Sequence, residues 1–91
     1  MTMQEEQQEL MTFPMDFPIK VMGLNDEALV RELHEMARGH FSKFDEGLTK
    51  TGLSRTGKYV SVTLTVRAES REQLDDFYRR AVAHPLVKVV L

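Results

Sequence analysis

The segment from Ser54 to Ala68, SRTGKYVSVTLTVRA, carries the clearest periodic pattern in the chain. Apolar residues occupy every second position after a turn at Gly57, with polar or aromatic residues between them: Val60, Val62, Leu64 and Val66 alternate with Tyr59, Ser61, Thr63, Thr65 and Arg67. This period of two predicts a strand with one buried side and one solvent-facing side. The chain is therefore expected to fold around a sheet that is covered on one face.

A shorter alternation precedes this strand, followed by a helical pattern. Residues 17–23 predict a first strand that ends at Gly23. Leucine, methionine and alanine then recur at helical spacing. Asn25 or Asp26 is the expected N-cap of this helix, and Gly39 is its expected end.

Three further elements complete the predicted order. Residues 47–53 form a weaker strand whose threonines and glycine suit a sheet edge. Ser70 and Gln73 form a capping box that begins a second amphipathic helix, and Pro85 prevents that helix from continuing. Residues 86–91, LVKVVL, are rich in β-branched side chains and predict a last strand.

The resulting order, βαββαβ, predicts an α+β fold of the two-layer ferredoxin-like kind. In this arrangement both helices cover one face of a four-stranded antiparallel sheet. The expected core lies between the layers and comprises Ile19, Val21, Val60, Val62, Leu64, Val66, Val87 and Val89 from the sheet and Leu29, Leu33, Met36, Leu74, Phe77 and Ala81 from the helices. The expected open face carries Lys20, Met22, Tyr59, Ser61, Thr63, Thr65, Lys88 and Val90.

Length and composition indicate one small domain. Residues 1–12 are rich in glutamine and glutamate and are expected to form a flexible acidic tail, and residues 13–91 a single ferredoxin-like domain. The net charge is −2, and the remainder is close to neutral because the first sixteen residues hold acids and no base, so a nucleic acid is not favoured as partner. The chain has no cysteine and no stretch of about 20 apolar residues, which favours a cytoplasmic protein without a membrane partner.

Known activities of this fold need residues that the chain does not supply. A metallochaperone needs a pair of cysteines, and an acylphosphatase needs an arginine in the first loop, which here reads MGLNDE. An RNA-recognition motif needs more than the one aromatic, Tyr59, that the third strand offers. His34, His40 and His84 lack metal-ligand spacing and are interpreted as surface or helix-end residues. We therefore expect no catalytic residue, no metal and no cofactor.

Several short motifs carry a resemblance to a known family. They are Phe13-Pro14 with Phe17, Lys20-Val21-Met22-Gly23, Ser54 with Gly57, Tyr59 and Ser61-Val62-Thr63 leading to Ala68, and the closing Val90-Leu91. Over residues 13–91 the chain resembles the YbeD-like family of small uncharacterised bacterial proteins. The resemblance implies a fold akin to the ACT regulatory domain, no established activity and a link to lipoate metabolism. It supplies no catalytic residues.

The first of two functional hypotheses is a non-enzymatic regulatory or adaptor domain. It would act through protein–protein contacts, with another protein or with a second copy in a homodimer, using an edge strand or the open sheet face. Met22, Tyr59 and Thr63 are the expected interface residues, because a flexible thioether and a broad aromatic ring gain most from losing water.

The alternative hypothesis is an ACT-like sensor of a small molecule such as an amino acid. The ligand would lie at the first strand–helix loop, formed by Gly23, Leu24, Asn25 and Asp26. Gly23 would let the backbone approach a ligand, and Asp26 with Glu27 would disfavour anions. A structural interpretation, in which Gly23 ends a strand and Asn25 caps a helix, accounts for the same residues and is preferred.

Overall fold

The structure, a computed structural model, describes residues 12–91 and confirms the ferredoxin-like α+β fold. The elements are β1 (Met15–Leu24), α2 (Glu27–His40), a short 3₁₀ helix η1 (Glu46–Leu48), β2 (Lys50–Leu53), β3 (Tyr59–Ala68), α3 (Arg71–Val82) and β4 (Val87–Val90). All neighbouring strands are antiparallel, in the order β2-β3-β1-β4. The predicted tail, residues 1–12, lies outside the described residues except for Thr12, so the division after residue 12 stays a prediction.

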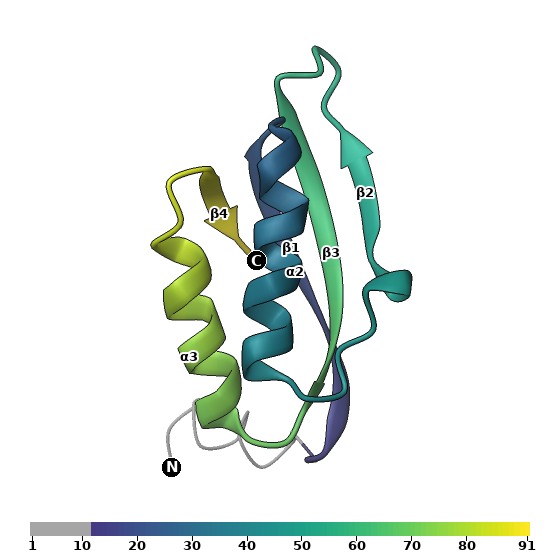
Figure 1. Cartoon of the computed structure of the whole chain (residues 1–91), viewed down its shortest axis with the longest axis vertical. Helices are drawn as coiled ribbons and strands as arrows, with labels where there is room; N and C mark the ends of the chain where they lie inside the picture. The colour runs from purple at the N-terminus through teal and green to yellow at the C-terminus, as the bar shows by residue number, and fades with distance from the viewer. Residues whose placement is uncertain (1–11) are drawn as a thin grey trace, which may run out of the picture.

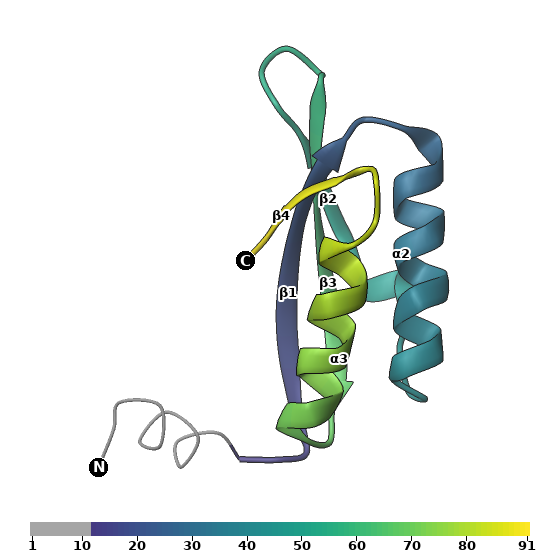
Figure 2. The same cartoon turned by 90° about the vertical axis from the view of Figure 1, so that its left-hand side faces the viewer.

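The two helices lie side by side on one face of the sheet (Figures 1 and 2). Their apolar sides meet the buried sides of β1 and β3 in a single core comprising Ile19, Val21, Leu29, Leu33, Ala37, Phe41, Val60, Val62, Leu64, Val66, Ala68, Leu74, Phe77 and Ala81. In the described part of the chain, no helix covers the opposite face of the sheet (Figure 2). The two helices therefore bury one face of the sheet.

The predicted alternation of β3 is confirmed. Even-numbered residues from Val60 to Ala68 are buried and odd-numbered residues are half-buried. β3 pairs with the whole length of β1, from Met15 opposite Ala68 to Leu24 opposite Tyr59. Residues opposite one another in an antiparallel pair face the same side, so this register fixes which β1 residues share the open face.

Pro18 lies inside β1 without costing a bond of the sheet. The Lys20 carbonyl accepts a hydrogen bond from Leu91 N–H at 2.8 Å, so even-numbered residues of β1 turn their backbone polar groups toward β4. β4 pairs with β1 only from Val21 to Gly23. The missing N–H of Pro18 therefore points to an edge beyond the end of β4, where proline is tolerated.

A bulge in β4 makes one core prediction wrong. The register shifts so that Val89 lies opposite Met22, Val90 opposite Val21 and Val87 opposite Gly23. Val89 is thus 42% exposed on the open face, whereas Val90, predicted on that face, packs against the core with Val87. An extra residue in one strand reverses the alternation beyond it, which a pattern of two consecutive valines does not reveal.

The first helix begins at Asp26, the second of its two predicted caps, and it ends later than predicted. The preferred interpretation is therefore wrong in two details, since Asn25 is not the cap and β1 continues past Gly23 to Leu24. The Asp26 side chain caps it by accepting a hydrogen bond from Ala28 N–H at 2.8 Å. The predicted end at Gly39 is wrong, because the helix runs to His40 and Gly39 does not take a left-handed conformation. Phe41 ends it instead: its backbone is extended, its side chain is 1% exposed within the core, and its N–H donates to the Ala37 carbonyl.

The connections around β2 and α3 follow from side-chain capping. The predicted strand over residues 47–53 is shorter, since the Asp45 carboxylate accepts from Gly47 N–H at 2.9 Å and begins η1 in its place. The capping role of Ser70 is confirmed by its bond from Gln73 N–H at 3.1 Å. The Gln73 side chain also donates to the His40 carbonyl at 2.7 Å, which ties the start of α3 to the end of α2.

Candidate functional site

The loop between β1 and α2 uses its polar groups within the chain. Leu24 N–H donates to the Leu86 carbonyl at 2.9 Å, and Asn25 N–H donates to the Lys58 carbonyl at 3.0 Å. The Asn25 side chain donates to the Gly57 carbonyl at 2.9 Å, and Asp26 caps α2. The structure thus brings the predicted ligand residues together, with their donors already engaged by the β2–β3 turn and by the segment before β4.

Gly23 is placed against protein atoms. A Cβ atom at this position would lie 2.5 Å from the Leu86 carbonyl oxygen and 2.9 Å from Cδ2 of Leu29. Such distances are too short for any side chain, so packing alone requires glycine here. The close approach that the sensor hypothesis assigned to a ligand is made by the backbone of Leu86.

Three surface hollows lie away from this loop. One of about 320 Å³ lies between α3 and β1 and is lined in part by Phe17, Leu74 and Tyr78. Burial raises the pKa of the Tyr78 hydroxyl; the charge of Arg71 opposes this shift in part, and the charge of Asp75 adds to it. The other two, of about 570 and 300 Å³, lie beside Ser70 and beside His84. Among residues 12–91, no group of three or more His, Cys, Asp or Glu side chains is placed to hold a metal ion.

The open face of the sheet is built from rows of residues that cross the strands. The register gives these rows, from the β2–β3 turn downward: Leu24 with Tyr59; Val89, Met22, Ser61 and Gly52; Lys20, Thr63 and Lys50; Pro18 with Thr65; and Asp16 with Arg67. All three predicted interface residues, Met22, Tyr59 and Thr63, are half-buried in this face. The structure therefore places them on one continuous surface.

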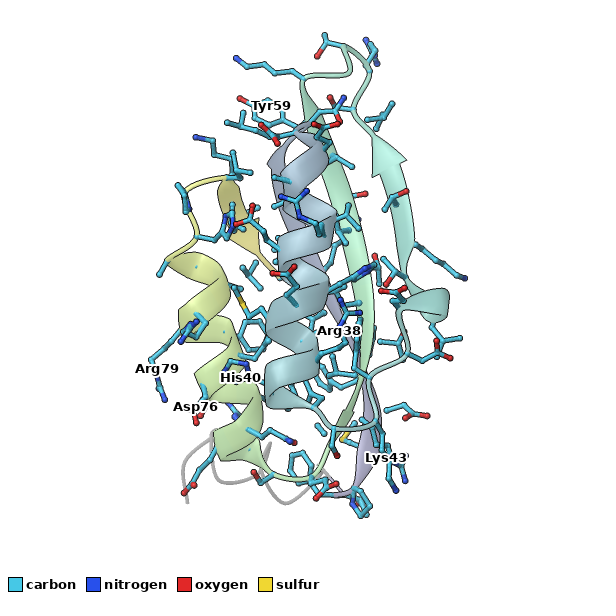
Figure 3. All side chains as sticks on the ribbon, viewed as in Figure 1. Arg38, His40, Lys43, Tyr59, Asp76 and Arg79 are labelled. Atoms are coloured by element: carbon cyan, nitrogen blue, oxygen red, sulfur yellow. The ribbon has the colours of Figure 1, made fainter. Side chains whose placement is uncertain are left out.

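The upper part of this face, nearest the turn, is apolar. Met22 lies beside the exposed Val89, and Tyr59 lies in the next row. Figure 3 shows Tyr59 at the turn end of the sheet, far from Asp76 and Arg79 on α3. The Lys58 ammonium lies 5.4 Å from the centre of the Tyr59 ring, close enough for a cation–π contact. Together these side chains form an aromatic and thioether patch with a cationic rim.

The edge strand β2 offers a second exposed surface. All of its residues from Lys50 to Leu53 are exposed. Ser54 N–H bonds to the Tyr59 carbonyl, so the even-numbered residues of β2 turn their backbone groups toward β3. Thr51 therefore turns its backbone N–H outward, away from the sheet.

Two of the three histidines are less exposed than predicted. The His34 and His84 side chains are 13% and 10% exposed, and each lies near a carboxylate, Glu46 at 3.4 Å and Glu32 at 3.1 Å. His40 lies at the end of α2 as predicted. The hydrogen bond from Arg38 at 2.7 Å and the charge of that guanidinium hold the pKa of Glu46 below its ordinary value.

Sequence reasoning missed two features of the open face. It placed Val90 there instead of Val89, because the bulge in β4 has no signature in LVKVVL. It also missed that Lys50 joins Lys20 and Thr63 in one row. The length of the turn that joins Leu53 to Tyr59 sets this pairing, so a prediction of the hairpin register could have found it.

The comparisons with known proteins agree over nearly the whole chain. Residues 8–91 match the family described as "Protein of unknown function (DUF493)". A "UPF0250 protein" of Janthinobacterium sp. (strain Marseille) is 46% identical over 84 residues, which is 92% of each chain. A "UPF0250 protein" of Paraburkholderia phytofirmans is 44% identical over 92% of this chain and 94% of its own, and one of Chromobacterium violaceum is 39% identical over 98% and 100%.

Proposed function

We propose a function for this chain, which belongs to the DUF493 family and to the YbeD-like small bacterial proteins that its sequence resembles. In this proposal it is a non-enzymatic adaptor, and it binds a partner protein through the open face of its sheet. The observation that carries the proposal is the patch formed by half-buried Met22 and Tyr59 with exposed Val89, on a face without a covering helix in residues 12–91. Large apolar side chains on a surface gain free energy when a partner removes water from them.

The geometry of the first loop supports this choice over the sensor. A ligand at Gly23–Asp26 would need backbone donors that now bond to Leu86 and Lys58. It would also need room at Gly23, which the Leu86 carbonyl fills. The open face has no such prior occupant among the described residues.

The proposal also covers the cellular location of the protein and its regulatory role. We expect a cytoplasmic protein, in keeping with the absence of cysteine from its sequence. In the described residues no helix has both the length and the apolar character to cross a membrane. A regulatory role linked to lipoate metabolism is the expectation of the family resemblance, and a captured partner would test it.

The test is affinity capture from the native cell with three forms of the full-length chain. The wild type is compared with the double variant Met22→Ala/Tyr59→Ala and with Thr51→Pro. The double variant changes only the open face, while Thr51→Pro removes a backbone donor that points out from the β2 edge. Circular dichroism melts of both variants verify that the fold is retained.

The proposal predicts a reproducible partner that the wild type and Thr51→Pro capture and that the double variant loses. Loss with Thr51→Pro alone would assign binding to the sheet edge through main-chain hydrogen bonds. A chain that captures no partner, yet shows chemical-shift changes at Gly23 to Asp26 with free amino acids, would replace the adaptor with the ACT-like sensor.

A further inference from the structure

Charge is divided unequally between the two layers of the molecule. The described strands hold the basic residues Lys20, Lys50, Arg67 and Lys88, and their acidic residue is Asp16. The β2–β3 turn adds two further basic residues, Arg55 and Lys58. The described helices α2 and α3 are close to neutral, because they hold six acids and five arginines: Glu27, Glu32, Glu35, Glu72, Asp75 and Asp76 against Arg31, Arg38, Arg71, Arg79 and Arg80. The net charge of −2 therefore conceals a basic sheet.

The basic charge of the open face is concentrated in one row. Lys20 and Lys50 lie on either side of Thr63, each one strand away from it. Strands are spaced about 4.8 Å apart, so the two backbone positions are about 10 Å apart. Both lysines are exposed, and the carboxylates that form ion pairs in residues 12–91 engage arginines and histidines instead. Asp16, the acid on this face, is paired with Arg67 at 3.3 Å.

This arrangement argues against a second copy on the open face. A symmetric face-to-face dimer whose two-fold axis passes through this row would bring the Lys20 and Lys50 rows of both copies together. Like charges opposed across an interface are unfavourable and exclude such partners. An occupant that lies over the Lys20–Thr63–Lys50 row is instead favoured when it supplies negative charge.

The aromatic content of the face favours a protein over a nucleic acid. Proteins that bind single strands stack successive bases on several aromatic rings. In the described strands the open face offers the ring of Tyr59, and Lys58 already lies over it. Met22 and Val89 beside it suit aliphatic side chains of a polypeptide.

We infer that the partner presents an acidic segment to the open face, with carboxylates over the Lys20–Thr63–Lys50 row and apolar side chains over Met22, Tyr59 and Val89. The inference rests on the proposed function and adds the chemistry of the partner. The lysines supply attraction at long range and fix the register of the segment, and the apolar patch supplies the desolvated contact.

Fluorescence anisotropy with defined probes tests this inference. The probes are a peptide in which a run of glutamates is followed by a run of valines, the matching peptide in which lysines replace the glutamates, and single-stranded oligothymidine. The full-length wild type is compared with Lys20→Glu/Lys50→Glu and with the control Arg31→Glu/Arg79→Glu. The control makes the same charge change on the helices, where both arginines are exposed and Figure 3 shows Arg79 on α3.

The wild type and the control are expected to bind the glutamate peptide about tenfold more tightly than the lysine peptide, and the Lys20→Glu/Lys50→Glu variant to lose this preference. The preference should shrink between about 0.1 M and about 1 M salt, as the Debye length falls from about 10 Å to about 3 Å. Melting curves verify that each variant is folded.

Equal binding of the two peptides, or no binding of the glutamate peptide, would overturn the inference, and binding of oligothymidine alone would assign the face to nucleic acid. The proposed function fails separately. A captured partner that is lost with Met22→Ala/Tyr59→Ala but kept with Lys20→Glu/Lys50→Glu would preserve the adaptor and refute its acidic partner.

Discussion

Replacement of Gly23 by alanine tests whether this residue serves packing or a ligand. The added Cβ would lie 2.5 Å from the Leu86 carbonyl oxygen and 2.9 Å from Cδ2 of Leu29. The Leu86 carbonyl belongs to the backbone and accepts the 2.9 Å bond from Leu24 N–H, so it cannot move aside without cost. The change should therefore push the segment before β4 away from β1.

The magnitude follows from two contributions. Overpacking a buried site costs about 1–3 kcal/mol, and a weakened hydrogen bond adds about 1 kcal/mol. A total of about 3 kcal/mol is a large share of the roughly 4–12 kcal/mol expected for a domain of this size. It should lower Tm by about 12–24 °C, measured by circular dichroism at fixed protein concentration.

Gly39→Ala is the matched control. Nothing lies within 4 Å of a Cβ at Gly39, which is an exposed residue of α2. Alanine is favoured over glycine in a helix by about 1 kcal/mol, so this variant should raise Tm by about 4–8 °C. A Gly23→Ala chain that melts within a few degrees of the wild type would refute the packing explanation and return Gly23 to the ligand hypothesis.

Three further predictions address the sheet, the N-terminal segment and pH. Val62→Asp should cost more than about 4 kcal/mol by burying a charge, whereas Thr63→Asp on the open face should cost less than about 1 kcal/mol; equal losses in thermal melts would contradict the assignment of faces. Deletion of residues 1–10 should leave Tm unchanged to within a few degrees, and a larger drop would assign that segment to the core. Because Arg38 lowers the pKa of Glu46, the pair adds stability above the ordinary carboxyl value of 4.5 that is lost as pH falls through the lowered pKa. Arg38→Ala should therefore reduce the loss of Tm between neutral and acidic pH, and an unchanged pH profile would count against this pairing.

The parts of the fold that depend on regular alternation could be predicted from the sequence. Val60 to Val66 and the side chains between them gave the faces of β3, and the order of elements then gave the ferredoxin-like arrangement. The edge position of β2 followed from its threonines and glycine, and all of its residues are exposed. These patterns could be predicted because the spacing of apolar residues indicates which side of each element is buried.

The parts that depend on one irregular residue could not be predicted. The bulge at β4 exchanged the positions of Val89 and Val90, since both are valines and either parity fits the pattern. The helix passed Gly39 because burial of Phe41, a tertiary contact, decided where it ended. The near-burial of His34 likewise depends on the segment from Phe44 to Thr49, which contacts it through the Phe44 ring, Glu46 and Thr49.

For the candidate site, the sequence predicted residues and the structure supplied their neighbours. Met22, Tyr59 and Thr63 share the open face as expected, but the role of that face stays a prediction. The pairing of Lys50 with Thr63 depends on the register of the β2–β3 hairpin, which alternation alone leaves open. Because the composition of the chain is near neutral and the face of Lys50 could not be predicted, the basic charge of the sheet was missed.

The most direct test of the open face as the binding surface is an NMR titration of the isotopically labelled chain with its captured partner. The adaptor account predicts that amide shifts concentrate at Met22, Tyr59 and Thr63, with small changes on α2 and α3. Shifts confined to Lys50–Leu53 or to the loop from Gly23 to Asp26 would contradict it.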